Sequence, residues 1–300
     1  MYKYYKRDPH FFIKYNAVSI LTLAVASIFF YIYWSALPEI DNNWLLFLAI
    51  LPLCLTNVWI ILFSAILVSV IARMQGYFAV SLQDLWLLPL GVVIGLQSAW
   101  LMHNAAHESF KPAWLNRLIG ELTGLHQLSG FPGWAVHHII HHQNPDDPLK
   151  DPHPPVLLTF REYFWQMGPL MARVARNAFF ELWGDQEQTR RLWRVVVWSS
   201  LICRYARNAL LLIVLGPKVF VLCFIVSKLI NYAWYVHFNY YTHRPNARGE
   251  IEILNLDHNL YYKVMNATMA GAYFHKNHHR KASLFDPRRL DSEAGRENPT

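Results

Sequence analysis

Residues 193–237 read WRVVVWSSLICRYARNALLLIVLGPKVFVLCFIVSKLINYAWYVH, an almost unbroken apolar stretch. A helix that crosses a bilayer needs about 20 apolar residues, and this stretch is long enough for two such helices. Gly216 and Pro217 stand near its middle, and a Gly-Pro pair favours a turn. The stretch therefore predicts a hairpin of two membrane-spanning helices.

Arg204 and Arg207 lie within the first arm of this hairpin, well away from its start. Charged side chains are costly at membrane depth. Three arrangements would lower that cost: the arm faces other parts of the protein, it enters the membrane late, or both side chains reach back to one surface. The sequence favours none of the three.

Three further apolar segments lie near residues 15–34, 44–72 and 82–101, and each is long enough to cross a bilayer. Hydrophobic residues make up 54% of the chain and the mean hydropathy is +0.15, values that argue against a water-soluble globule. We therefore predict an all-α, multi-pass integral membrane protein with about four spans. We treat residues 1–300 as one domain.

Polar residues gather in two segments, 103–192 and 238–300, which we expect to form a cap outside the lipid. The N-terminal stretch MYKYYKRDPHFFIK (residues 1–14) is basic, whereas the loop ALPEIDNN (36–43) carries only acidic charges. Because positive residues mark the cytoplasmic side of a membrane protein, we expect the N-terminus in the cytoplasm.

The charge indicates which kind of partner the protein binds, and the cysteines indicate whether it has disulfides or a CxxC pair. The net charge is +7, but the lysines and arginines flank apolar segments, so anionic head groups or an acidic redox partner explain them better than nucleic acid. Cys54, Cys203 and Cys223 are isolated within apolar segments, which predicts buried thiols and neither a disulfide framework nor a CxxC pair.

Four local clusters contain histidines at helical spacing, and every one lies in a polar segment or at its edge. Residues three or four apart share one face of a helix, so the side chains of each cluster can converge. His137 and His141 are also four apart, which makes the second cluster ambiguous by spacing alone. The clusters are His103 and His107 in HNAAH; His138, His141 and His142 in HHIIHH; Asn239 and His243 in NYYTH; and His275, His278 and His279 in HKNHH.

So many imidazoles predict a metal site rather than core histidines. A structural zinc takes four protein ligands and a catalytic zinc takes three, so eight or nine histidines indicate two metal ions. Imidazole suits zinc, copper, iron and nickel, and only a redox metal activates dioxygen. Two irons are our leading hypothesis, and the spacing leaves two zincs open.

Acidic residues beside the clusters could orient the ligands. A metal-bound histidine usually donates its other N–H to a carboxylate, a carbonyl or water. The alternative role of these acids is to cap helices and form turns. They are Glu108, Asp146, Asp147, Asp151 and Asp257. The prolines of QNPDDPLKDPHPP (143–155) are expected to end the helix that carries the second cluster.

The remaining histidines have no such spacing, and we expect most of them to be structural. They are His10, His126, His153, His237 and His258. Among them His258 is the first to test as a ligand, because Asp257 adjoins it and it precedes the last cluster.

At these residues the sequence resembles the membrane fatty acid desaturase and hydroxylase superfamily, whose signature is HxxxH, HxxHH and a distal HxxHH. The three motifs stand here in order at residues 103–107, 138–142 and 275–279, and the resemblance covers roughly residues 85–285. It selects His138 over His137. The NxxxH element of acyl-CoA desaturases is matched by Asn239, which would reach a metal through water, and by His243 as a direct ligand.

The resemblance implies a helical membrane protein with a histidine-rich cap and active site on the cytoplasmic side. It also implies a histidine-bound pair of iron ions, dioxygen as cosubstrate and a separate electron donor of the ferredoxin, rubredoxin or cytochrome b5 type. No HPGG heme-binding stretch occurs in the sequence, and the basic stretch RKASLFDPRR (280–289) could receive an acidic donor.

One feature departs from this topology. If the N-terminus and the motifs are both cytosolic, an even number of spans must precede His103, yet three apolar segments do. One of them must then be re-entrant or interfacial, or the segment 44–72 must fold back near Pro52.

We expect the function to be oxidation of an unactivated C–H bond in a lipid chain, with fatty acyl desaturation first. Alternatives are a hydroxylase, ketolase or decarboxylase that acts on an alkane, a carotenoid or a fatty acid. A membrane metal transporter is the alternative from another class. It predicts ligands within the apolar spans, whereas these clusters lie outside them or at their ends.

Overall fold

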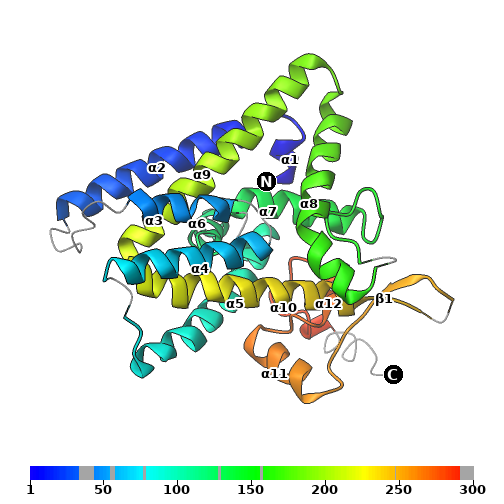
Figure 1. Cartoon of the computed structure of the whole chain (residues 1–300). Coiled ribbons are helices and arrows are strands. Elements are labelled where there is room, and N and C mark those ends of the chain that lie inside the picture. The colour runs from blue at the N-terminus through cyan, green and yellow to red at the C-terminus, as the bar shows by residue number, and fades with distance from the viewer. Residues whose placement is uncertain are drawn as a thin grey trace.

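The computed structural model describes residues 1–33, 44–54, 58–76, 79–127, 130–155, 158–246 and 248–290. The described part is mostly helical, as predicted (Figure 1). One small departure from an all-α fold is an antiparallel pair of short strands, β1 (His243–Pro245) and β2 (Ile251–Ile253).

The described residues form helices of very different lengths. In chain order they are α1 (Tyr2–Tyr5), α2 (Phe11–Tyr33), α3 (Trp44–Ala49), η1 (Leu51–Cys54), α4 (Val58–Met74), η2 (Leu82–Trp86), α5 (Leu87–Ala106), α6 (Trp114–Gly124), α7 (Phe131–Gln143), α8 (Phe160–Trp183), α9 (Glu187–Val219), η3 (Phe220–Ile225), α10 (Val226–Thr242), α11 (Leu260–Thr268) and α12 (His275–Arg280).

The long apolar stretch bends where the Gly-Pro pair predicted. Gly216 has φ 70° and ψ 162°, a conformation outside the helical region, so α9 breaks there before the chain continues through η3 into α10 (Figure 1). Glycine is needed at this position because residues with a Cβ rarely adopt positive φ. The two arms of the predicted hairpin therefore meet at Gly216.

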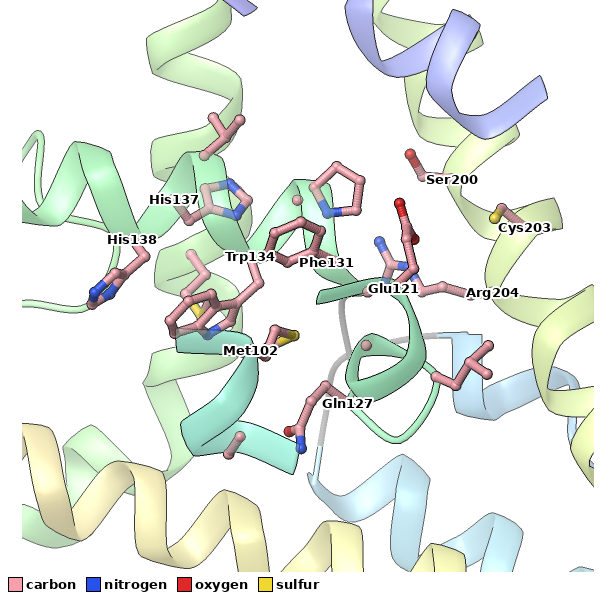
Figure 2. Close-up of a pocket in the computed structure, with 18 of the residues that line it drawn as sticks. Met102, Glu121, Gln127, Phe131, Trp134, His137, His138, Ser200, Cys203 and Arg204 are labelled. Atoms are coloured by element: carbon pink, nitrogen blue, oxygen red, sulfur yellow. The ribbon is translucent and has the colours of Figure 1, made fainter. Parts of the chain in front are cut away.

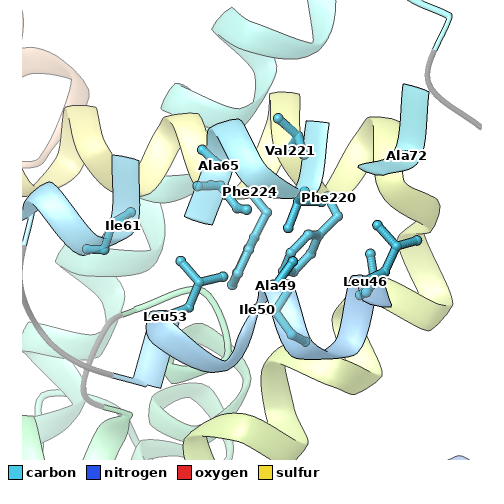
Figure 3. Close-up of a cluster of buried hydrophobic side chains, with 13 residues drawn as sticks. Leu46, Ala49, Ile50, Leu53, Ile61, Ala65, Ala72, Phe220, Val221 and Phe224 are labelled. Carbon is cyan, nitrogen blue, oxygen red and sulfur yellow. The ribbon is translucent and has the colours of Figure 1, made fainter. Parts of the chain in front are cut away.

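The segment 44–72 is two packed helices rather than one continuous helix. It breaks at η1, which contains Pro52, and α3 and η1 pack against α4. Leu46 and Ile50 from the first piece share a buried cluster with Ile61 of α4 and with Phe220 and Phe224 of η3 (Figure 3). The break lies at Pro52, where one of the arrangements that the sequence left open has it, and the number of membrane crossings stays a prediction.

Among the described residues, two helical stretches are long and apolar enough to cross a membrane, Leu82–Ala106 and Glu187–Thr242. Shorter apolar helices cover Phe11–Val25, Trp44–Cys54 and Trp59–Met74. Large apolar side chains are exposed on the outer faces of several of these helices, and an extended apolar surface of this kind fits contact with lipid. They include Val18, Leu21 and Val25 of α2, Trp59, Phe63, Ile66 and Val70 of α4, and Val195, Trp198 and Ile202 of α9.

Helix α5 packs closely against η3 and α10 through two glycines. A Cβ on Gly91 would overlap the backbone carbonyl of Cys223, and a Cβ on Gly95 would overlap the side chain of Asn231. These close contacts fix the N-terminal half of α5 against η3 and α10.

We expect Gly91→Ala to lower the apparent melting temperature of the detergent-purified protein, because a backbone carbonyl cannot yield to the added methyl group. Overpacking of this kind costs about 1–3 kcal/mol. Gly133→Ala in α7 is the matched control, since a Cβ there meets no atom within 4 Å. The control should melt at the wild-type temperature or above it. Equal melting of the two variants would contradict the close packing at Gly91.

Candidate metal centre

Local structure places the three histidine motifs on helices, as predicted. His103 lies in the last turn of α5 and His107 caps it, the second motif lies in α7, and the third opens α12. Helix α7 ends at Gln143, just before the proline-rich stretch. The prediction that Asn239 and His243 share a helical face is wrong. Helix α10 ends at Thr242, and His243 is extended with φ −121° and ψ 97°.

The first group of histidines joins α5, α7 and α12. One ring nitrogen from each of His103, His107, His138 and His278 lies within 4.8 Å of the others. The Nε2 atoms of His107 and His138 are 2.8 Å apart. Segments far apart in the sequence thus bring four imidazoles to one point.

The second group adds β1 to α7 and α12. Its members are His141, His243, His275 and His279, again with one nitrogen each within 4.8 Å of the others. His275 Nε2 lies 3.0 Å from His243 Nε2 and 3.1 Å from His279 Nε2. Figure 1 shows α12 and β1 beside the C-terminal end of α10.

His142 lies between the two groups. Its Nε2 is 3.1 Å from His138 Nε2 and 2.9 Å from His278 Nε2, and its ring centroid is 4.2 Å from that of His279. The structure therefore brings all nine predicted histidines into one continuous cluster. That they bind iron stays a prediction.

Two carboxylates orient the second group. His141 Nδ1 donates to Asp151 Oδ2 at 2.8 Å, and His243 Nδ1 donates to Asp146 Oδ2 at 2.9 Å. Because a carboxylate only accepts, each Nδ1 carries the hydrogen and each neutral ring keeps its lone pair on Nε2. His141 Nε2 is buried without a hydrogen-bond partner. Lone pairs that face one another in this way suit a metal cation, so these residues fit the predicted metal site.

The other three predicted acids have different roles. Asp147 accepts hydrogen bonds from the backbone N–H groups of Leu149 and Lys150, at 2.8 and 3.1 Å, and so forms a turn. Asp257 accepts from the side-chain amide of Asn266 at 3.3 Å. Among the described residues, neither Asp257 nor Glu108 contacts a histidine of the two groups through a hydrogen bond.

Two tryptophans fix ring planes in the first group. Trp134 stacks on His138 with centroids 4.5 Å apart, and Trp100 stacks on His103 at 5.1 Å, each at an interplanar angle of 14°. Stacking restricts rotation of both imidazoles, which preorganises their nitrogens.

Burial favours the neutral form of several histidines in the cluster. It lowers the pKa of His142 to about 3, and the neighbouring imidazoles act in the same direction. The pKa values of His141 and His275 are also lowered well below their usual range, chiefly by burial. Neutral imidazole is the form that binds a metal.

The isolated histidines include one that the spacing did not single out. His153 is buried, and its ring centroid lies 4.3 Å from that of His141. It forms a third group of potential ligands with His141 and Asp151. Both of its ring nitrogens lack a hydrogen-bond partner. Its position two residues after Asp151 was the available signal. By contrast, His258 is exposed and belongs to none of the three groups.

The other isolated histidines make ordinary contacts away from the cluster. His126 Nε2 lies 2.9 Å from the hydroxyl of Ser227, His237 Nδ1 lies 2.9 Å from the hydroxyl of Tyr273, and His10 is exposed beside Asp8. Asn239 is buried and donates to the carbonyl of Tyr235 at 2.8 Å.

A large cavity reaches the histidine cluster. Its volume is about 1150 Å³, somewhat larger than that of a usual ligand pocket. His103, His138, His275, His278 and Asn239 line one part of it, and most of the rest is apolar. Figure 2 shows Trp134 next to His138 in the wall of the cavity, with Phe131 on the far side of Trp134. An apolar chain could therefore extend to the histidines.

A sequence model of the family described as fatty acid desaturase matches residues 81–284. The chain belongs to the fatty acid desaturase family. The matched range includes all three histidine motifs, Asp146, Asp151 and β1, so the family covers the whole candidate centre. Members of this membrane-bound family oxidise lipid chains, and the chain is accordingly an oxidoreductase. No curated protein and no solved structure matched the chain.

Proposed function

We propose that this desaturase-family protein uses two iron ions and dioxygen to oxidise an aliphatic lipid chain, with fatty acyl desaturation as the first candidate reaction. The observation that carries the proposal is the pair of four-histidine groups, joined by His142, at the wall of a large apolar cavity. Family members typically depend on two irons. Zinc has no redox chemistry, so iron fits an oxidoreductase better.

Each group would hold one metal ion. His103, His107, His138 and His278 would hold the first, and His141, His243, His275 and His279 the second, with His142 available to either. When bound, the irons supply the activation of dioxygen that removal of hydrogen from an unactivated C–H bond requires. Asn239 would contact the centre through water.

The residues of the chain position the substrate and protect the reaction. The apolar wall of the cavity binds the aliphatic chain and excludes water from the reacting carbon. Asp146 and Asp151 hold the imidazoles of His243 and His141 in the tautomer that leaves Nε2 free. The placement of the substrate carbon relative to the metals decides between loss of two hydrogens and insertion of oxygen.

We also propose the membrane arrangement and the electron source. The chain would be a single-domain, multi-pass protein with the histidine cluster on the cytoplasmic side, as the basic N-terminus suggests. Electrons would come from a separate carrier of the ferredoxin, rubredoxin or cytochrome b5 type. The exposed basic residues of the C-terminal part favour an acidic carrier.

Metal analysis and product analysis test the proposal together. We expect about two irons per chain in the purified protein, since each group offers four imidazoles. Mass spectrometry of lipids from cells that express the protein with a donor system should show products that have lost two hydrogens at unchanged oxygen count. A gain of oxygen would assign a hydroxylase or ketolase instead. Variable zinc or copper without an oxidised lipid would overturn the proposal and favour a metal transporter.

A further inference from the structure

Three basic side chains line the cavity away from the histidine cluster. Arg204 and Arg207 come from α9 and Lys228 comes from α10. Arg207 is 7% exposed and Lys228 is 3% exposed. Figure 2 shows Arg204 and Glu121 on the opposite side of the cavity from His138. Of the arrangements that the sequence left open for the two arginines, the structure has them facing the protein interior.

The contacts of these cations leave much of their hydrogen-bonding capacity unused. Arg204 donates to the carbonyl of Cys54 at 2.8 Å, and Arg207 donates to the carbonyl of Gly124 at 3.4 Å. A guanidinium has five N–H donors, and the Nε of Arg207 is buried without a partner. The ammonium of Lys228 lies 4.2 Å from the ring centroid of Phe224. Within the part of the chain that the structure describes, none of the three forms a salt bridge.

The cavity has an excess of positive charge. Its charged lining residues are Arg117, Glu121, Arg204, Arg207 and Lys228. Burial raises the pKa of Glu121 to about 7, with Arg207 opposing the shift, so this single acid is only partly ionised near neutral pH. Buried cations without a counter-charge are costly, and an ionisable group at membrane depth marks a functional site. An anion in the cavity would remove that cost.

We propose that the cavity binds an acyl lipid whose anionic oxygen head group, a carboxylate or a phosphate, lies among Arg204, Arg207 and Lys228, while its aliphatic chain extends to the histidine cluster. The inference deepens the proposed function, on which it rests, by naming the substrate class. Arginine suits such a head group because its N–H donors match two oxygens at once. A neutral alkane or carotenoid would leave all three cations without a counter-charge.

Binding of matched ligands to the metal-loaded protein, without an electron donor, tests the inference. The ligands are hexadecanoate, hexadecyl phosphate, hexadecanol and hexadecane, which share one chain length, and equilibrium dialysis in detergent measures their affinities. At least one anion should bind roughly tenfold tighter than hexadecanol, since hydrogen bonds to charged groups are the strong ones. The tighter of the two anions identifies the head group. Equal affinity for the anions and hexadecanol would overturn the inference.

Variants assign the selectivity to the cations. Arg207→Gln and Lys228→Gln should each lower the ratio of anion to hexadecanol affinity, again by roughly tenfold. Arg73→Gln removes one positive charge from an exposed position at the end of α4 and should leave the ratio unchanged. A ratio that stays at the wild-type value in both cavity variants would overturn the assignment. Hexadecanol binding by each variant shows that the cavity itself is intact.

The two proposals fail in different ways. Anion-selective binding with no oxidised lipid in the product analysis would support the head-group site and overturn the proposed function. Oxidation of hexadecane by a protein that binds anions and hexadecanol equally would overturn the head-group site and leave the proposed oxidation standing.

Discussion

Replacing His141 with alanine is expected to abolish lipid oxidation while leaving the protein in the membrane. His141 belongs to the second histidine group and also to the group with Asp151 and His153, so two potential ligand sets lose a member. The first group keeps its four histidines, and bound iron should therefore fall by about half rather than disappear. Loss of one buried imidazole removes little of the apolar surface that holds the helices together.

Iron content, product formation and recovery from the membrane fraction measure this outcome. His258→Ala is the control, because it removes one imidazole from an exposed position outside the three groups of potential ligands. The control should keep the iron content and activity of the wild type. An active His141→Ala variant with its full iron would contradict the proposed second site.

Helix-breaking residues explain how much of the fold could be predicted. Gly216 and Pro217 mark a real bend. Glycine readily adopts positive φ, and proline lacks the N–H that a continuous helix needs, so the pair favours a break in the helix. Pro52 marks a break too, but the length and apolarity of segment 44–72 fit one long span equally well. The two pieces, α3 and α4, both pack against η3, and that contact joins residues that lie far apart in the sequence.

For the candidate centre too, the local features could be predicted from the sequence and the contacts between distant segments could not. Spacing of three and four residues placed the histidines of each motif on one helical face, because that periodicity is local. Whether His153 or His258 lies near the metal ligands depends on which of them the folded chain brings beside α7. Local spacing does not encode that contact. His243 was expected within a helix, yet it opens β1 because α10 ends one residue earlier.

The grouping of Arg204, Arg207 and Lys228 at one cavity could not be predicted from local sequence patterns either. Arg204 and Arg207 were recognised as costly in an apolar helix, but their partners could not be inferred. Lys228 stands alone in the second apolar arm, and its sequence neighbours give no sign of the two arginines. Their common position at one cavity arises from the bend at Gly216, which brings residues of α9 and α10 to line the same space.

Asp151→Asn is expected to weaken iron binding by about 10- to 100-fold, the usual effect of removing a partner of a metal-bound histidine. Asp151 is fully buried, and its Oδ2 accepts from His141 Nδ1 at 2.8 Å and from the backbone N–H of Asp146 at 2.7 Å. An amide has the same shape but no charge, and it can turn its NH₂ toward His141. The ring would then lose the partner that keeps Nε2 free for the metal.

Asp147→Asn separates this effect from a general disturbance of the loop. Asp147 lies in the same proline-rich stretch, and its carboxylate contacts only backbone N–H groups of Leu149 and Lys150 in the hydrogen bonds that the structure shows. Titration of the iron-loaded proteins with a chelator should strip iron from Asp151→Asn well before Asp147→Asn or the wild type. Excess iron should restore activity to the Asp151 variant, because its imidazoles are all present and only their orientation is weakened. If both variants held iron as tightly as the wild type, the Asp151 carboxylate would have no part in preparing His141 for the metal.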